Sequence, residues 1–149
     1  MPTVQKVART DAGLASELRI SVMRLRRRLA NERHPDNDLS MNAMAVLGAL
    51  HRGGDQTVGE LATHERVQPP SMTRTVKCLV EAGLVDRRGD ANDGRRVVCS
   101  LSEAGRATVL ADRRRRDEWL AQRLHELSRE ERDVLRRAAP ILESLATKD

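Results

Sequence analysis

Four polar side chains fall on one arc of a helix that we predict over residues 68–82. Met72, Val76 and Leu79 recur there at helical spacing, so the opposite face would pack on a core. No acidic residue occurs on the polar arc before Glu81. Guanidinium, ammonium and hydroxyl groups bind phosphate oxygens and other hydrogen-bond acceptors. The arc carries Ser71, Arg74, Thr75 and Lys77, and Thr73, beside the apolar stripe, is a fifth candidate.

An amphipathic helix of this kind could equally be an ordinary surface helix, so the neighbouring residues decide between the two interpretations. Thr57 and Glu60 have the spacing of a capping box, which predicts the start of a short helix upstream. Pro69 and Pro70 suit the first turn of the second helix, and Gly83 suits its C-cap. Two short helices joined by a few residues, the second basic on its outer face, are typical of a helix-turn-helix.

Two strands are predicted after this helix pair, over residues 84–88 and 95–101. The segment between them, 89–94, is dense in turn residues, so residues 86–101 should form a hairpin, the wing of a winged helix-turn-helix. Residues 66–96 hold seven Lys and Arg against four Asp and Glu, a net +3 (7 − 4), so much of the chain's formal +5 lies there. A basic surface on such a unit indicates DNA binding, with the second helix as the recognition helix in the major groove.

The composition excludes several other classes of protein. Aromatic residues make up 1% of the 149 residues, whereas readers of single-stranded nucleic acid stack bases on aromatic side chains, so double-stranded DNA is the better partner. No apolar run approaches the ~20 residues that cross a bilayer, and the N-terminus lacks an apolar signal core. Two cysteines without framework spacing indicate a reducing compartment. We therefore expect a cytoplasmic protein with no membrane partner.

The other elements are predicted to be helices, and hydroxyl side chains mark where three of them begin. Ser40 and Ser102 are suitable N-caps, and Ser128 opens a second capping box. In the last helix, Pro140 predicts a kink or a break at Ala139. The expected fold class is mostly α (α+β): a winged helix-turn-helix with flanking N- and C-terminal dimerisation helices.

The flanking helices carry more apolar surface than a small winged unit needs for its own core. The first begins at Asp11 and must stop near Arg33, because Pro35 follows. Unused apolar helix surface at both chain ends predicts a homodimer. A two-fold dimer would place two recognition helices about 34 Å apart, on a pseudo-palindromic DNA site. We therefore expect a helical dimerisation region, 11–34 and 103–146, and a winged helix-turn-helix DNA-binding region, 39–102.

Patterns typical of enzymes and metal sites are missing from the sequence. Gly53-Gly54 is not followed by the lysine and hydroxyl residue of a phosphate loop, and no G-x-S-x-G elbow occurs. His64-Glu65 lacks the second histidine of a zinc helix. We expect no enzyme, no metal and no cofactor. The alternative to DNA binding is a winged-helix module that binds protein, although the acid-poor recognition helix suits phosphate better.

Residues 93–105 read Asp-Gly-Arg-Arg-Val-Val-Cys-Ser-Leu-Ser-Glu-Ala-Gly, a D-x-R pattern that leads into L-[ST]-x-x-G. Residues 79–87, Leu-Val-Glu-Ala-Gly-Leu-Val-Asp-Arg, lie where the second helix should end. On these motifs the chain resembles the MarR family of winged-helix transcription regulators. The helix order matches from about Asp11 to the C-terminus, and residues 71–74 stand where that family places base-reading side chains.

The resemblance implies how the wing works. The family's wing arginine, Arg95 by position, enters the minor groove, and Asp93 would orient its guanidinium through a bidentate pair. Narrow A·T-rich minor grooves attract such an arginine. Arg87 and Arg96 would meet phosphates, whereas Arg74 would contact a guanine edge. The other candidates on the recognition helix would divide between bases and backbone.

The resemblance also implies a cleft for a small phenolic or anionic effector, between the first helices and the winged region. Arg24, Arg28 and His51 are the cations near that cleft, although each could belong to a hydrated basic surface. The family's thiol-sensing members carry a cysteine near the first helix, which this chain lacks. We interpret Cys78 and Cys99 as small packing residues, with Cys78 the better redox candidate. A dimer that covers a promoter would act as a repressor.

Overall fold

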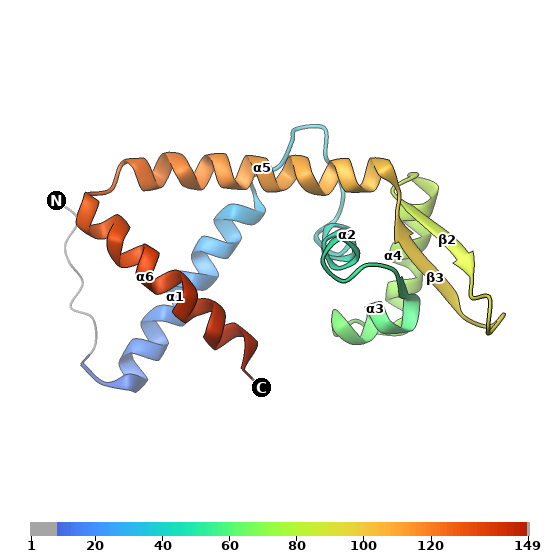
Figure 1. Cartoon of the computed structure of the whole chain (residues 1–149), viewed down its shortest axis with the longest axis horizontal. Helices are drawn as coiled ribbons and strands as arrows, with labels where there is room; N and C mark the ends of the chain where they lie inside the picture. Colours follow the sequence, from blue (N-terminus) through green and yellow to red (C-terminus); the bar gives the residue numbers. More distant parts are fainter. Residues whose placement is uncertain (1–8, 149) are drawn as a thin grey trace. The chain divides into compact units, whose positions relative to one another are not determined.

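The computed structural model describes residues 9–148, which belong to two compact units. Residues 34–114 form the winged unit. Residues up to 33, together with those from 115 onward, form the terminal unit. The long helix α5 (Glu103–His125) contributes its first half to the winged unit and its second half to the terminal unit (Figure 1).

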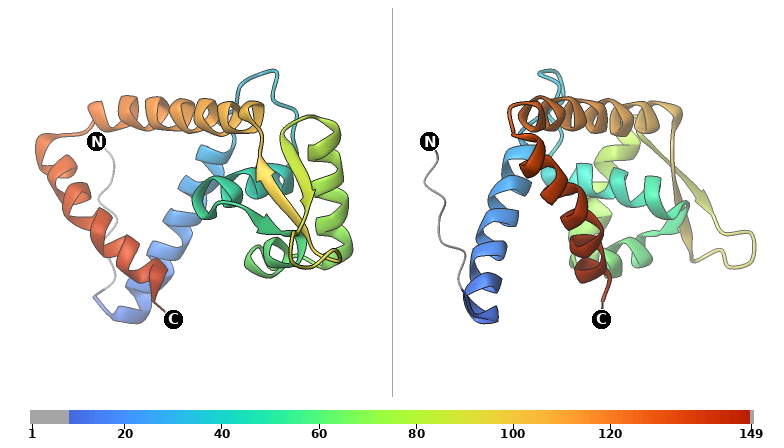
Figure 2. Two further views of the ribbon diagram at one scale, coloured as in Figure 1. Left: turned by 45° about the vertical axis from the view of Figure 1, so that its right-hand side comes forward. Right: turned by 60° about the vertical axis from the view of Figure 1, so that its left-hand side comes forward.

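The winged unit follows the predicted order of helices and strands. Its helices are α2 (Met41–Gly53), α3 (Val58–His64) and α4 (Pro69–Glu81). Its strands are β1 (Gln56–Thr57), β2 (Val85–Gly89) and β3 (Val97–Leu101), which form an antiparallel sheet in the order β1-β3-β2. α4 contacts both α3 and β2, and Figure 2 shows the β2–β3 hairpin beside it. The prediction of a mostly α fold with a winged helix-turn-helix is confirmed.

The sheet differs from the prediction in two places. The sequence did not predict β1, which pairs Gln56 with Cys99 and Thr57 with Val98. The second hairpin strand was expected to begin at Arg95 but begins at Val97, because the two preceding arginines belong to the turn. Arg95 and Arg96 are therefore carried by a loop whose ends are fixed by the ladder, whereas Arg87 and Arg88 lie on β2 in the ladder itself.

The core of the winged unit is largely aliphatic and draws on α2, α3, α4, the first half of α5 and the two wing strands. α4 contributes Met72, Val76 and Leu79, and the largest other fully buried side chains include Leu47 and Leu61. Burying one such side chain stabilises a fold by about 1.5–3 kcal/mol. The apolar stripe of α4 therefore fixes which of its faces is left for solvent or a ligand.

Side-chain caps begin the helices where the sequence predicts them. Ser40 Oγ accepts a hydrogen bond from the Ala43 N–H at 3.0 Å. In α3, Thr57 Oγ1 accepts from the Glu60 N–H at 3.1 Å, and Glu60 Oε2 accepts from the Thr57 N–H at 3.3 Å, which completes the capping box. Each cap of this kind stabilises its helix by about 1 kcal/mol. The start of the helix-turn-helix is thus encoded locally.

The end of α4 is joined tightly to the start of α5. Gly83 adopts a left-handed φ of 74°, and the Leu84 N–H donates to the Leu79 carbonyl at 2.9 Å, which closes a Schellman motif. A Cβ on Gly105 would lie 2.1 Å from the Leu84 carbonyl oxygen, so α5 can approach this junction only with glycine there. Ser102 Oγ donates to the Gly83 carbonyl at 2.6 Å. The L-[ST]-x-x-G motif therefore fixes the C-terminal end of α4 against the start of α5.

The terminal unit consists of α1 (Asp11–Ala30), the second half of α5 and α6 (Arg129–Thr147). Ser128 opens α6 with the predicted capping box. Of the predicted kink or break at Ala139, the break is wrong, because α6 continues past Pro140 to Thr147. Proline removes one backbone hydrogen bond from the helix, and the regular turns on both sides carry the helix through.

Candidate nucleic-acid interface

α4 presents the polar face that its sequence predicts. Met72, Val76 and Leu79 are 2%, 1% and 1% exposed, so the opposite face lies in solvent. Arg74 and Lys77 are exposed on that face, and Thr73, beside the stripe, is exposed as well. The side chains of Ser71 and Thr75 are half-buried. All five candidates can therefore be reached from solvent along one helix.

The hydroxyl groups of α4 have internal partners that decide what they can offer a ligand. Thr73 Oγ1 donates to the Pro69 carbonyl at 3.0 Å, and Thr75 Oγ1 donates to the Ser71 carbonyl at 3.1 Å. A hydroxyl that has donated its hydrogen keeps its lone pairs, so these threonines remain acceptors. Arg74 Nη2 lies 3.5 Å from Ser71 Oγ, which leaves its other donors for a ligand. Amino groups on base edges suit the threonines, and acceptor atoms suit Arg74.

Lys77 has one acidic neighbour, at the C-terminal end of the helix. Its Nζ lies 4.0 Å from Glu81 Oε1, and the two side chains are 69% and 66% exposed. An exposed pair at this distance contributes little energy and breaks readily when a better partner arrives. Lys77 is therefore available to a phosphate.

The tip of the wing is a turn in which Asp93 acts on the backbone. Asp93 Oδ1 accepts from the Arg95 N–H at 3.0 Å, and the Asp93 carbonyl accepts from the Arg96 N–H at 3.0 Å. The Asp90 N–H donates to the Arg96 carbonyl at 2.9 Å. The predicted bidentate pair between Asp93 and the Arg95 guanidinium is not what the structure shows, since Asp93 Oδ1 accepts from the backbone N–H of Arg95 and no ion pair joins the two side chains. Asp93 fixes the backbone from which Arg95 projects.

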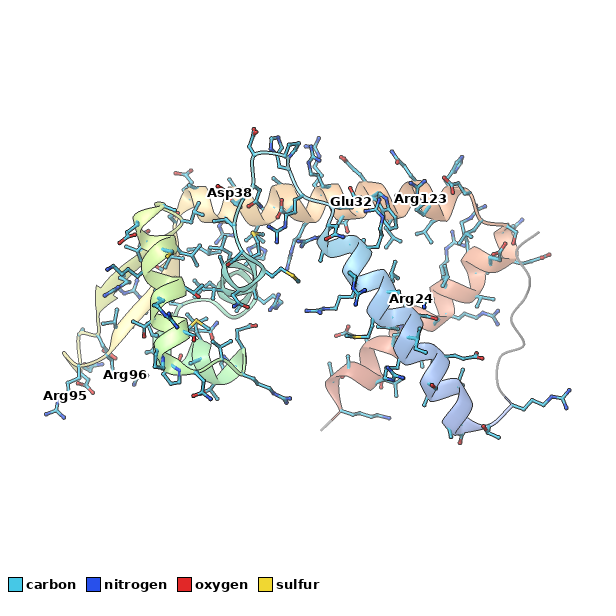
Figure 3. The ribbon with its side chains drawn as sticks, turned by 180° about the vertical axis from the view of Figure 1, so that it is seen from behind. Arg24, Glu32, Asp38, Arg95, Arg96 and Arg123 are labelled. Carbon is cyan, nitrogen blue, oxygen red and sulfur yellow. The ribbon has the colours of Figure 1, made fainter. Side chains whose placement is uncertain are left out.

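The four arginines of the wing fall into two pairs. Arg88 is bound to Asp55 at 2.8 Å, and Arg96 to Glu60 at 3.0 Å. Arg87 and Arg95 have no acidic partner among residues 9–148. Figure 3 shows Arg95 at the end of the wing, pointing away from the ribbon. The guanidinium group of Arg95 is therefore free to enter a groove.

A groove of about 390 Å³ joins the wing to the helix pair. Its walls come from the start of α3, the middle of α4 and the two wing strands. Of the predicted site residues, it brings together Thr73, Arg87, Arg95 and Arg96, but neither Arg74 nor Lys77 lines it. The site is thus a basic surface with two centres, one on the recognition helix and one along the wing.

The three predicted effector residues are not assembled into one site within either unit. In the terminal unit Arg24 is exposed, whereas Arg28 pairs with Glu32 and its guanidinium lies 4.6 Å from the centre of the Trp119 ring. In the winged unit, burial of the His51 ring lowers the pKa of His51, and the nearby guanidinium groups lower it further. Its Nδ1 is buried without a hydrogen-bond partner in the described part of the chain. The guanidinium groups are those of Arg113, Arg106 and Arg52.

The two cysteines differ in their surroundings. Cys99 lies at the centre of the sheet and is 0% exposed, and burial raises the pKa of its thiol in spite of the nearby Arg87. Cys99 is therefore a packing residue, as predicted. Cys78 is exposed on α4, so the interpretation of this residue as a small packing residue is wrong. Its position follows from the helical period, because it lies between the buried Val76 and Leu79 only in sequence and points elsewhere.

Sequence reasoning missed the acidic partners of the wing. Glu60 was recognised only as part of a capping box and Asp90 only as one of the turn residues of segment 89–94, and Asp55 was assigned no role. Their partners Arg88 and Arg96 lie 33 and 36 residues from Asp55 and Glu60, so no local pattern links them.

No helix within residues 9–148 has the length and apolar character needed to cross a membrane. In the same range, no cluster of three His, Cys, Asp or Glu side chains is arranged to hold a metal ion.

The chain is similar in sequence and in fold to known transcriptional regulators. Residues 39–97 match the MarR family. An HTH-type transcriptional regulator of Mycobacterium bovis is 48% identical over 136 residues, which cover 91% of this chain and 94% of that protein. A transcriptional regulator from Pseudomonas aeruginosa has a crystal structure with a TM-score of 0.82 and 36% identity, over 95% of this chain and 100% of that chain.

A mutant of S. aureus MepR bound to an oligodeoxyribonucleotide shares the fold, with a TM-score of 0.66 and 22% identity over 88% of this chain and 96% of that chain. The winged helix-turn-helix, the basic face of α4 and these relatives together identify the class of protein. The chain belongs to the MarR family and is a DNA-binding transcriptional regulator of the helix-turn-helix type.

Proposed function

We propose that the protein is a ligand-responsive homodimeric repressor that binds a pseudo-palindromic operator. The recognition helix, residues 68–82, enters the major groove, and the wing, residues 86–101, enters the minor groove. The observation that carries this proposal is the acid-poor, solvent-facing arc of α4, opposite its fully buried apolar stripe. The DNA-bound MepR structure supports it, because that protein has the same fold.

Each candidate side chain has a role that its surroundings suit. Arg74 contacts a guanine edge, since a guanidinium can bind O6 and N7 together. Arg95 lies in the minor groove, where narrow A·T-rich segments concentrate negative potential. Arg87 and Lys77 bind phosphates and fix the register on the duplex. The hydroxyl groups of Ser71, Thr73 and Thr75 complete the contacts along the recognition helix.

The proposal of a homodimer rests on the outer helices. Neither α1 nor α6 has a single buried residue, although together they span 39 residues (20 + 19) with many large apolar side chains. Exposed apolar surface of this extent marks an interface. A second copy covers it by two-fold symmetry and sets the two recognition helices one DNA turn apart. The exposed side chains are Leu14, Leu18, Ile20, Val22, Met23, Leu25, Val134, Leu135, Ile141, Leu142 and Leu145.

We further propose a small phenolic or anionic effector, with His51 of the winged unit as its candidate contact. The basic surroundings of His51 and its unpartnered Nδ1 support an anion at that residue. The effector would release the protein from DNA if it binds the DNA-free conformation more tightly.

The test is selection of the preferred duplex from a random pool, followed by binding measurements with Arg74→Ala. The wild type should enrich an inverted repeat. Arg74→Ala should bind this duplex more weakly, by on the order of 1–3 kcal/mol of binding free energy. It should also lose the preference for one base at one position in each half-site. Arg129→Ala, which removes an exposed arginine at the start of α6, is the matched control. An unchanged base preference in Arg74→Ala would contradict the proposed role of α4.

The effector is tested on the same duplex by adding 2-hydroxybenzoate or benzoate at increasing concentration. Release of the wild type, with weaker release of His51→Ala, is expected. Equal release of both proteins would remove His51 from the proposed site.

A further inference from the structure

We propose that Glu60 and Arg96 position the wing for DNA binding and that Arg96 acts through this pair rather than as a phosphate contact. The inference rests on the proposed function, because it assigns a role within the same DNA-binding surface. It starts from a carboxylate that is shared between two elements. Glu60 Oε2 accepts from the Thr57 N–H at 3.3 Å, and Glu60 Oε1 accepts from Arg96 Nη2 at 3.0 Å.

The shared carboxylate ties the wing to the first helix of the helix-turn-helix. Glu60 lies in the first turn of α3, and its backbone N–H is held by Thr57 Oγ1, so its position is fixed by the capping box. Thr57 also pairs with Val98 in the sheet. The Arg96 guanidinium reaches back from the wing turn to this rigid point. The wing is thus connected to α3 by a side-chain pair in addition to the strand ladder.

Asp90 holds the same guanidinium from the other side. Its Oδ2 lies 3.9 Å from Arg96 Nε, and its N–H donates to the Arg96 carbonyl at 2.9 Å. Arg96 is therefore enclosed by acids at both ends of its head group, unlike Arg95, which points into solvent (Figure 3). Unlike Lys77, which has one acidic neighbour, Arg96 lies between two carboxylates, so the three side chains carry a net charge of −1 and a phosphate would have to displace both acids.

The ion pair between Arg96 and Glu60 orients the wing more than it stabilises the fold. The side chains of Arg96 and Glu60 are 51% and 45% exposed, and an exposed pair contributes little to folding. Its effect is to restrict the angles at which the wing turn, and with it Arg95, leaves the sheet. Preorganising a contact group lowers the entropy that binding would otherwise cost.

The two possible roles of the pair predict opposite effects of Glu60→Gln on the affinity for DNA. Removing a negative charge beside a DNA-binding surface should tighten binding if charge alone matters. If Glu60 positions the wing, Glu60→Gln should weaken binding to the selected duplex by about three- to tenfold. Glutamine can still accept from the Thr57 N–H, so the capping box survives.

The experiment measures binding to the selected duplex and to a scrambled duplex of the same composition, as a function of salt. Glu60→Gln should weaken only the selected duplex, and Glu65→Gln, which removes an acid at the other end of α3, should weaken neither. Arg96→Ala should behave like Glu60→Gln and keep the salt dependence of the wild type. The double variant should be no weaker than Arg96→Ala alone, because the pair acts as a unit.

Asp90→Asn leaves α3 untouched and should weaken selective binding in the same direction, which guards against a folding defect in the Glu60 variant. Tighter binding of Glu60→Gln to both duplexes would overturn the inference. Loss of about one unit of salt slope in Arg96→Ala, with equal weakening on both duplexes, would show that Arg96 is a phosphate contact instead. Failure of the wild type to prefer any duplex would contradict the proposed function rather than the role of the pair.

Discussion

At the scale of single residues, the wing shows how neighbouring arginines acquire different roles. Arg95 and Arg96 are adjacent in the sequence and equally basic, yet Arg96 meets two acids and Arg95 meets none among the described residues. A count of charged residues cannot distinguish Arg95 from Arg96. The structure separates a residue that can contact DNA from one that can hold the wing in place.

Arg95→Ala should weaken binding to the selected duplex while leaving the fold and the oligomeric state unchanged. The Arg95 side chain is exposed at the turn and has no acidic partner among residues 9–148, so its removal should not disturb the fold. Loss of its minor-groove contacts should cost about 1–3 kcal/mol of binding free energy. Fluorescence anisotropy at several salt concentrations measures both the affinity and the slope, which should fall by about one. Wild-type affinity in this variant would exclude Arg95 as a DNA contact.

At the scale of helices and strands, the sequence predicted an element's ends correctly wherever the signal for them lies within a few residues. The caps at Ser40, Thr57 and Ser128, and the glycine at the end of α4, were all read from the sequence and are confirmed. What the sequence could not show is contact between distant segments. β1 is two residues long and exists because β3, some forty residues later, supplies its partner.

The same limit explains one of the errors at the site. The role of Asp93 was inferred by family analogy between side chains, but a turn closed by backbone hydrogen bonds decides which atoms it reaches. The exposure of Cys78, by contrast, follows from the helical phase that Met72, Val76 and Leu79 already indicate in the sequence, and interpreting Cys78 as a packing residue overlooked that phase.

The turn of the helix-turn-helix contains a backbone feature that gives a stability prediction. Arg66 adopts a φ of 53°, and the Val67 N–H donates to the Ala62 carbonyl at 3.0 Å, so α3 ends in the same motif as α4 but with arginine in place of Gly83. A residue with a Cβ is strained in this region by about 1 kcal/mol. Arg66→Gly should therefore raise the free energy of unfolding by roughly 0.5–1 kcal/mol.

Urea unfolding of Arg66→Gly and of Gly83→Ala checks this prediction, since the second substitution introduces the strain that the first removes. Gly83→Ala should lower the free energy of unfolding by about 1 kcal/mol. Destabilisation in both variants would mean that contacts of the Arg66 side chain, and not its backbone, dominate.

At the scale of the whole molecule, the proposed reading of an operator requires two copies of the chain. α1 and α6 make sense as amphipathic helices only if their apolar faces are covered. Leu142→Glu places a charge on the apolar face of α6, where the side chain is 40% exposed in the single chain. We expect this variant to sediment as a monomer and to lose selective DNA binding, because one recognition helix cannot reach two half-sites.

Glu143→Ala, on the neighbouring residue but another face of α6, should remain a dimer with wild-type affinity. A dimeric Leu142→Glu would show that the apolar face of α6 is not part of the interface.

The most direct test of the account is a hydroxyl-radical footprint of the wild-type protein on its selected duplex, combined with the mass of the complex. Two copies should bind one duplex. They should protect two patches on the same side of the DNA, about 34 Å apart from centre to centre, with wing protection in the minor grooves beside them. A single protected patch, or protection that is the same on a scrambled duplex, would contradict the claim that paired recognition helices read this DNA.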